Sequence, residues 1–188
     1  MPRLAAAFLD GGATIVQIRS KRLASAPLLS HVEDLVRAAA PYGASIIVND
    51  RADLALVARA AGVHLGQDDL PPAAARRVLG PDAVVGYSTH TIGQIDAAAA
   101  EPVDYIAVGP VFGTRTKDTG YDAVGLALVA EAARRSRGRP VVAIGGITLA
   151  RAPEVLAAGA SSVAVIADLL TGGNPAVRVA AYLKALGL

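Results

Sequence analysis

The sequence lacks cysteine and tryptophan, and it has one methionine and few aromatic residues among its 188 positions. The absence of cysteine excludes disulfides, thiolate metal sites and a cysteine nucleophile. Aromatic residues make up 4% of the chain, so the core has to be built mainly from Ala, Val, Leu and Ile. Since 53% of the residues are hydrophobic, the composition is that of an ordered globular protein and not of a disordered one.

The charged residues form no strongly basic or acidic segment. The net charge is +2, and Lys and Arg are scattered, which gives little support to a role at nucleic acids or membrane surfaces. No apolar stretch approaches the length of a membrane span. The apolar run in MPRLAAAFLDGGA is interrupted by Asp10 and is too weak for a signal peptide. We therefore expect a cytoplasmic protein that needs no nucleic acid or membrane.

Short apolar segments typical of β-strands alternate with segments of helical periodicity along the chain. The strand-like segments are 13–19, 45–50, 62–66, 83–88, 104–109, 140–146 and 161–166. Helices are predicted over about 2–10, 28–39, 51–60, 71–79, 91–99, 124–136, 148–157 and 175–186. The alternation predicts βα units and a parallel sheet, and its even spacing predicts a single domain over residues 1–188.

Two arrangements of such a sheet have to be considered. Seven strands fit an open, doubly wound sheet, whereas a closed barrel of about eight βα units needs a further strand before the first helix. Polar residues follow nearly every predicted strand, and a barrel brings all of these strand ends into one ring around one pocket. We therefore predict an α/β fold of the (β/α)8 TIM-barrel type that lacks its first strand.

The segment VQIRSK places Gln17, Arg19 and Lys21 two residues apart. Period-two alternation puts these side chains on one side of the strand and its exit. An amide that donates and accepts hydrogen bonds, followed by two cations, suits a polar ring joined to a phosphate chain. The alternative is a strand that ends in solvent with ordinary surface cations, and these residues alone do not decide between the two.

Two further strands are followed by carboxylates, Asp50 in IIVND and Asp69 in GVHLGQDDLP. Neighbouring parallel strands lie about 4.8 Å apart, so the two carboxylates could share one cation. Oxygen ligands favour Mg²⁺, which keeps several waters and uses substrate phosphates as additional ligands. The alternative is that Asp50 and Asp69 cap the helices that follow them.

The segment GPVFGTRTKDTGYD (109–122) follows a predicted buried strand and offers backbone N–H groups, hydroxyls and two cations in one place. An anionic ligand needs such groups, although an exposed loop can have the same composition. Gly145 and Gly146 follow a later strand, where they allow close approach of a ligand to the backbone or form a tight turn. Barrels commonly bind phosphate at the loops after their last two strands, which favours a binding role.

Histidines near the predicted strand ends do not indicate nucleophilic catalysis. His64 lies within an apolar strand and is interpreted as a core or layer residue. Ser88 in GYSTHT could bind a phosphate oxygen or the ring of a ligand, or STHT could simply begin a helix. No Asp or Glu is placed by the local sequence to orient His90 in a Ser-His triad, so a nucleophilic mechanism is not expected.

Taken together and in this order, VQIRSK, IIVND, GVHLGQDDLP, VGYSTH, GPVFGTRTK and VVAIGGI resemble the motifs of the thiamine phosphate synthases, which are (β/α)8 barrels. The resemblance runs from about residue 4 to the end of the chain. It implies a transferase that joins 4-amino-2-methyl-5-hydroxymethylpyrimidine diphosphate to 4-methyl-5-(2-phosphoethyl)thiazole, or its carboxylated form, and releases pyrophosphate. The partners would be these two phosphorylated small molecules.

The same resemblance implies a role for individual residues. Asp50 and Asp69 would hold one Mg²⁺ ion. Arg19, Lys21 and Lys117 would be the catalytic cations, because negative charge grows on the leaving pyrophosphate. The pyrimidine diphosphate would be bound by Gln17, Ile18, Arg19, Ser20, Lys21, Asn49 and Ser88. The thiazole phosphate would be bound by Thr114, Thr116, Gly146, Ile166 and Ala167, with Arg115 also contacting substrate.

The sequence departs from the family pattern at two places. Members normally begin with a strand of the YxITD type, which this chain does not show, and they often have Ser at the position of Ala167. The related thiazole tautomerases share the barrel, but their relatives tend to lose the paired carboxylates and the TxTK loop, both of which are kept here. The retained carboxylates and loop favour the synthase over a tautomerase-like enzyme. The missing first strand leaves a non-catalytic phosphate-binding barrel as a further alternative.

Overall fold

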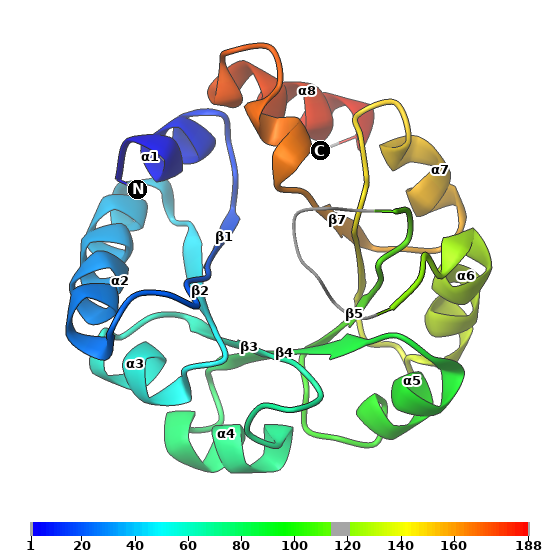
Figure 1. Cartoon of the computed structure of the whole chain (residues 1–188), viewed down its shortest axis with the longest axis horizontal. Helices are drawn as coiled ribbons and strands as arrows, with labels where there is room; N and C mark the ends of the chain where they lie inside the picture. Colours follow the sequence, from blue (N-terminus) through cyan, green and yellow to red (C-terminus); the bar gives the residue numbers. More distant parts are fainter. Residues whose placement is uncertain (1, 114–120, 188) are drawn as a thin grey trace.

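The computed structural model of the chain describes residues 2–113 and 121–187, in which helices surround a curled parallel sheet (Figure 1). The strands are β1 (Ile15–Ile18), β2 (Ser45–Asn49), β3 (Gly62–Leu65), β4 (Val84–Thr89), β5 (Tyr105–Val108), β6 (Val141–Ile144) and β7 (Ser162–Ala164). The α-helices are α1 (Pro2–Asp10), α2 (Ser25–Ala39), α3 (Ala52–Val57), α4 (Pro72–Leu79), α5 (Ile92–Ala98), α6 (Gly125–Arg135), α7 (Ala152–Ala157) and α8 (Pro175–Ala185). Two 3₁₀ helices, η1 (Ala40–Tyr42) and η2 (Ala167–Leu170), complete the described elements.

The strands follow one another in the sheet in chain order, and each is parallel to its neighbours. A doubly wound sheet would instead reverse its strand order at a switch point. The predicted barrel with seven strands is therefore confirmed, and the open doubly wound alternative is wrong. Because every strand runs in the same direction, all carboxyl ends lie on one side of the ring (Figure 1).

The ring of strands is open between β1 and β7, whereas the ring of helices continues past this opening (Figure 1). Within residues 2–113 and 121–187, no strand pairs with the outer edge of β1 or of β7. Outside the sheet, α1 packs against α8, and a Cβ added at Gly11 would lie 2.5 Å from the carbonyl oxygen of Ala176. A glycine is needed at this contact because it lets the chain after α1 touch the backbone of α8.

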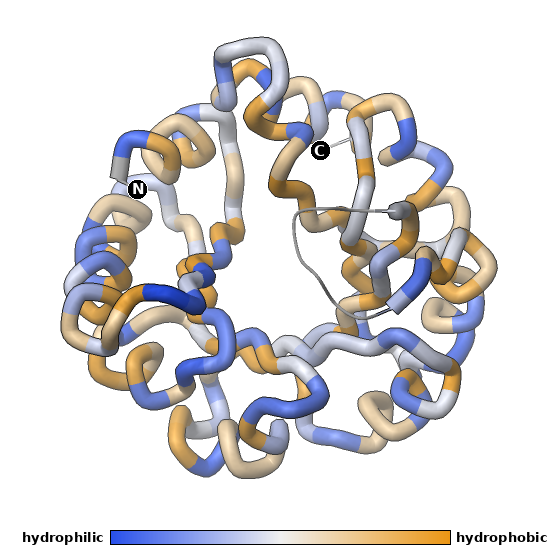
Figure 2. The backbone as a smooth tube through the Cα atoms, viewed as in Figure 1, coloured by the Kyte–Doolittle hydropathy of each residue, from blue (hydrophilic) through white to orange (hydrophobic). Residues whose placement is uncertain are grey.

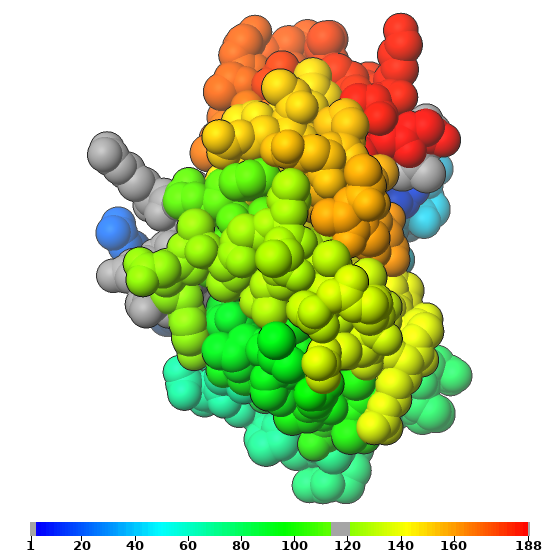
Figure 3. Space-filling view, turned by 90° about the vertical axis from the view of Figure 1, so that its right-hand side faces the viewer, coloured from blue at the N-terminus to red at the C-terminus, as the bar shows by residue number. Residues whose placement is uncertain are grey.

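Alternation along the strands divides their side chains between the helices and the interior of the ring. Val63, Leu65, Ile106 and Val108 are fully buried against the helices. Apolar residues accordingly concentrate along the strands and on the helix turns that face them (Figure 2), and α5, α6 and α7 cover one side of the sheet (Figure 3). None of the helices in the described ranges is long and apolar enough to cross a membrane.

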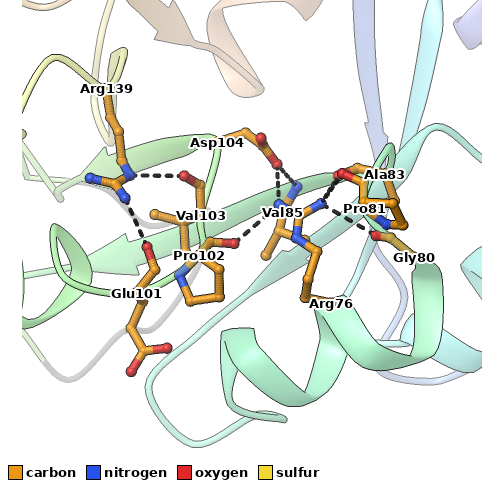
Figure 4. Close-up of polar contacts among 10 residues, drawn as sticks. All are labelled: Arg76, Gly80, Pro81, Ala83, Val85, Glu101, Pro102, Val103, Asp104 and Arg139. Atoms are coloured by element: carbon orange, nitrogen blue, oxygen red, sulfur yellow. Dashed lines mark hydrogen bonds and ion pairs between the residues drawn. The ribbon is translucent and has the colours of Figure 1, made fainter.

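At the amino ends of the strands, Arg76 joins several connecting segments (Figure 4). From the last turn of α4, its guanidinium donates to the carbonyl oxygens of Pro81 and Pro102, both at 3.1 Å. It also pairs with Asp104 at 2.7 Å, and Asp104 accepts the backbone N–H of Val85 at 2.7 Å. The planar fork of donors in arginine suits this arrangement, which fixes the starts of β4 and β5.

Arg139, just before β6, likewise binds backbone carbonyl oxygens of a connecting segment (Figure 4). Its guanidinium donates to the carbonyl oxygens of Ala99, Glu101 and Val103 at 2.8, 3.0 and 2.9 Å. These carbonyls belong to the segment between α5 and β5. The amino end of the sheet is thus held by cations that bind backbone oxygens.

Candidate active site

The exit of β1 and the end of β2 bring a cation and a carboxylate together at the carboxyl side of the sheet. The ammonium group of Lys21 donates a hydrogen bond to the carboxylate of Asp50. The Lys21 side chain is 57% exposed and that of Asp50 is 17% exposed, so the carboxylate lies deeper and the ammonium group lies at the rim. The positive charge of Arg19 also acts on Asp50. VQIRSK and IIVND therefore meet at the carboxyl side of the sheet.

The other site residues predicted on β1 and directly after it differ in their burial and in the direction of their side chains. Ile18 is buried against the helices, so Gln17, the preceding residue, is on the interior side of the sheet. Because the Ile18 side chain is buried, this residue can offer a ligand only its backbone. Ser20 accepts the backbone N–H of Leu23 at 3.1 Å and shapes the turn that carries Lys21.

Asp50 and Asp69, from the ends of β2 and β3, lie close enough for each carboxyl group to shift the pKa of the other. Burial raises the pKa of Asp69, and the hydrogen bond and charge of Asp50 raise it further. Burial also acts to raise the pKa of Asp50, but its hydrogen bonds with Asp69 and Lys21 outweigh burial and leave this pKa below its usual value. Two close carboxyl groups that differ in this way compete for one proton.

The backbone positions both aspartates without using them as helix caps. Asp50 has a left-handed φ of 65°, and its N–H donates to the carbonyl of His64 at 2.8 Å. Asp69 accepts the N–H of Gly66 at 2.7 Å. Other residues occupy the N-cap positions of α3 and α4. The capping interpretation is therefore wrong, and both carboxyl groups are directed to the same place at neighbouring strand ends.

Inside the ring, β3, β4 and β5 contribute a hydrogen-bonded cluster of side chains. His64 lies 2.8 Å through Nε2 from the hydroxyl of Ser88 and 2.8 Å through Nδ1 from the hydroxyl of Tyr105. In the sheet register, Gly86 lies between His64 and Tyr105. The interpretation of His64 as a layer residue is confirmed, since it is buried and points into the ring. Local sequence does not predict that Tyr105 contacts His64; Gly86, which lies between them in the register, is the one feature that leaves room for the contact.

Two amide side chains extend this polar lining. Asn49 is buried, and it lies directly opposite His64 in the register of β2 and β3. Gln67 follows β3 and donates from Nε2 to the carbonyl oxygen of Ser88 at 2.6 Å. Asn49 was predicted as a site residue, whereas Gln67 was not singled out. Gln67 fixes the backbone at the end of β4, close to Ser88.

His90 lies beyond the end of β4 and contacts the exit of β5. Its Nδ1–H donates to the carbonyl oxygen of Gly109, and its ring stacks on Tyr121 with 3.9 Å between centroids. The segment also begins α5, because the Thr91 hydroxyl accepts the N–H of Gln94 at 3.2 Å. The helix-start interpretation of STHT therefore holds for Thr91, whereas Ser88 belongs to β4, and His90 packs against the loop that follows β5.

The exits of β5 and β6 run side by side. The N–H of Val111 donates to the carbonyl of Ile144 at 2.8 Å, and that of Phe112 donates to the carbonyl of Gly145 at 3.0 Å. Gly146 has a φ of 63°, and a Cβ there would lie 2.6 Å from the carbonyl oxygen of Gly113. Glycine is therefore required for this backbone contact. Four predicted residues lie outside the described ranges: Thr114, Arg115, Thr116 and Lys117.

Ile166 and Ala167 form the start of η2 after β7. The next residue, Asp168, accepts hydrogen bonds from Arg178 at 2.7 Å and from Tyr182 at 2.5 Å, both on α8. These contacts fix η2 against α8 at the carboxyl side of the sheet. Ile166 is 52% exposed, so the backbone at this predicted site is accessible.

The chain matches the family model described as Thiamine monophosphate synthase over residues 1–169. A thiamine-phosphate synthase of Koribacter versatilis (strain Ellin345) is 45% identical over 179 residues, which cover 95% of this chain and 83% of that protein. A thiamine-phosphate synthase of Saccharopolyspora erythraea is 45% identical over 194 residues, covering 100% and 86%. The solved structure of the thiamine phosphate pyrophosphorylase from Pyrococcus furiosus is 30% identical, with a TM-score of 0.91 and coverage of 99% and 89%.

Proposed function

The chain belongs to the thiamine monophosphate synthase family of transferases, and on this basis we propose that it makes thiamine phosphate from two phosphorylated small molecules. The substrates are 4-amino-2-methyl-5-hydroxymethylpyrimidine diphosphate and 4-methyl-5-(2-phosphoethyl)thiazole, or its carboxylated form. The second product is pyrophosphate, and the carboxylated form additionally releases CO₂. We expect the reaction to take place in the cytoplasm, without nucleic acid or membrane.

The observation that carries this proposal is the meeting of Lys21, Asp50 and Asp69 at neighbouring strand ends. A lysine at the rim supplies a compact positive charge for a phosphate group. Two carboxylates below it supply oxygen ligands for a divalent cation that also binds the diphosphate. The arrangement therefore fits a substrate that carries a diphosphate.

The donor set fits one Mg²⁺ ion held by Asp50 and Asp69. Their competition for one proton supports this assignment, since a divalent cation compensates both charges. Described residues contain no group of three or more His, Cys, Asp and Glu side chains suited to a metal, so the protein would supply few ligands. This is typical of Mg²⁺, which completes its shell with water and phosphate oxygens. When bound, Mg²⁺ supplies positive charge to the leaving diphosphate.

The chemistry requires neutralisation of charge and correct placement of two rings. The bond between the methylene carbon of the pyrimidine and the diphosphate oxygen breaks, and its electron pair leaves with the oxygen. Arg19, Lys21 and Lys117 stabilise the negative charge that develops there. The thiazole nitrogen then donates its lone pair to the pyrimidine cation and forms the new C–N bond. No general base is needed, because no proton is removed.

The two substrates would occupy adjacent sectors of the same strand-end ring. Gln17, Asn49 and Ser88 line the interior sector and suit the pyrimidine ring, with Ser20 and the backbone of Ile18 beside them. The thiazole phosphate would lie between the GTRTK segment and the later strands. Its binding groups there are Thr114, Arg115, Thr116, Gly146, Ile166 and Ala167. Such binding holds the thiazole nitrogen in line with the methylene carbon, which is a proximity effect.

Measuring the formation of thiamine phosphate and pyrophosphate tests this function. The purified chain is incubated with both substrates and Mg²⁺, and thiamine phosphate and pyrophosphate are quantified against a sample with a chelator. We expect equal amounts of both products, formed only with the metal. A folded chain that forms neither product, but isomerises a thiazole phosphate, would instead be a tautomerase-like enzyme. A folded chain that binds substrates and transforms none would be a non-catalytic phosphate-binding barrel.

A further inference from the structure

We propose that Tyr105 and His64 are positioning residues which fix the hydroxyl of Ser88 as a hydrogen-bond donor toward the ligand. The identity of that ligand rests on the proposed function: it is a hydrogen-bond acceptor atom of the pyrimidine diphosphate. The direction of the hydrogen bonds within the protein follows from the geometry of the cluster and from the protonated state of the Tyr105 phenol, and it needs no ligand.

The three strands place these groups in two adjacent layers of the ring interior. His64, Gly86 and Tyr105 are directly opposite one another in the register of β3, β4 and β5. Since Gly86 has no side chain, the rings of His64 and Tyr105 stack above it with 5.5 Å between centroids. A Cβ at Gly86 would lie 2.0 Å from the ring of Tyr105. Ser88 is the next interior residue of β4, one layer closer to the carboxyl ends.

The tyrosine determines the direction of the first hydrogen bond. Burial raises the pKa of Tyr105 far above its usual value, so the phenol keeps its proton at neutral pH. Within the described part of the chain, His64 Nδ1 is the one group recorded within hydrogen-bond distance of this hydroxyl, at 2.8 Å. The hydroxyl is partly buried inside the ring, and leaving its proton without this acceptor would cost a hydrogen bond. Tyr105 therefore donates, and Nδ1 accepts.

The direction at Tyr105 determines the direction at Ser88. A neutral imidazole that accepts at Nδ1 carries its proton on Nε2. Nε2 therefore donates to the hydroxyl oxygen of Ser88, at 2.8 Å. The proton of Ser88 is then left for another acceptor, in the layer nearest the carboxyl ends of the strands. A substrate that offers a ring nitrogen or a phosphate oxygen at this place gains a preoriented donor.

The tautomer of His64 tests the proposal without any substrate. ¹⁵N NMR of the labelled chain distinguishes a protonated imidazole nitrogen from an unprotonated one, and the signals of His64 are identified by their loss in His64→Gln. We expect protonation at Nε2 and a bare Nδ1. Protonation at Nδ1 would overturn the proposal. This result does not depend on synthase activity. Failure of the proposed function can therefore be distinguished from failure of the proposed hydrogen-bond directions.

A double-mutant cycle tests whether Tyr105 acts through Ser88. We expect Ser88→Ala to lower kcat/KM for the pyrimidine diphosphate about tenfold, and Tyr105→Phe to lower it about threefold, as the loss of single hydrogen bonds would. Combined with Ser88→Ala, Tyr105→Phe should have no further effect, because their contributions are not independent. Tyr42→Phe removes an exposed hydroxyl that donates to Asp10 at 2.6 Å, and it serves as the matched control with unchanged kinetics. A full, additive effect of Tyr105→Phe in the Ser88→Ala background would overturn the proposal.

Discussion

The two ends of the sheet use charged side chains in opposite ways. At the amino end, Arg76 and Arg139 bind backbone carbonyl oxygens that the fold itself holds in place. At the carboxyl end, Lys21 is more than half exposed, and Asp50 and Asp69 compete for a proton. The first set of charges is compensated within the protein, whereas the proposed function would compensate the second by binding an ion and a phosphate.

This difference separates stability from function along one axis of the molecule. In barrels generally, the loops at the carboxyl ends of the strands form the active site, and the opposite face contributes to stability. Substitutions at the carboxyl end should therefore lower activity and leave the fold intact. Substitutions at the amino end should lower stability and leave the activity of the folded protein unchanged.

The largest effect is expected at Asp50. Asp50→Ala removes a proposed metal ligand and the partner of Lys21, so turnover should fall about a hundredfold or more, as for loss of a group that stabilises developing charge. Lys117→Ala should have an effect of similar size. Asp68→Ala, at an exposed neighbour of Asp69, is the matched control and should retain normal rates. Near-normal rates in both Asp50→Ala and Lys117→Ala would show that the site has been assigned wrongly.

The next effect in size is expected at Arg76. Arg76→Met removes the donor of several carbonyl oxygens and the cation beside Asp104, which should lower the free energy of unfolding by about 2–3 kcal/mol in urea denaturation. The kcat of the protein that remains folded should not change. Arg77→Met, at an exposed position of the same helix, should have little effect on either quantity. A large loss of kcat in folded Arg76→Met would contradict the separation of the two ends.

A smaller effect, of opposite sign, is expected at Asp69 in the absence of Mg²⁺. Its pKa is higher in the folded state than the ordinary 3.8, so protonation of Asp69 favours folding. This contribution is complete below pH 3.8 and is lost as the pH rises through the pKa of the folded state. Asp69→Asn should therefore be more stable than the parent at neutral pH, although less active.

Thermal denaturation with and without Mg²⁺ checks this expectation. The metal should raise the Tm of the parent chain, because it binds the folded state, and it should raise that of Asp69→Asn much less. An equal Tm increase in both proteins would show that Asp69 is not a ligand.

The smallest effect is expected on the outer surface, away from both ends. Arg135 pairs with Asp96 and with Glu131, each at 3.0 Å, in surroundings open to solvent. Exposed ion pairs of this kind contribute little to stability. Arg135→Gln should therefore leave both the urea midpoint and kcat unchanged. A clear loss of either would show that charge on the outer surface matters as well as charge at the two ends.

The sequence alone predicted the order of strands and helices, because their apolar periodicities differ and Gly-rich or polar segments separate them. It also predicted that the polar residues after the parallel strands would gather in one ring, and Lys21 and Asp50 do meet there. It did not decide whether Asp50 and Asp69 cap helices, because that depends on the backbone conformation after each strand. The contact between His64 and Tyr105 depends on register across three strands and on the space above Gly86, which no local pattern records.

The most direct test compares Asp50→Ala and Arg76→Met in one assay, with thiamine phosphate formation measured per folded molecule. We expect a rate at least about a hundredfold below the parent for Asp50→Ala, and a rate within about twofold of it for Arg76→Met. The opposite result, with activity kept in Asp50→Ala and lost in folded Arg76→Met, would contradict the assignment of the chemistry to the carboxyl end of the sheet.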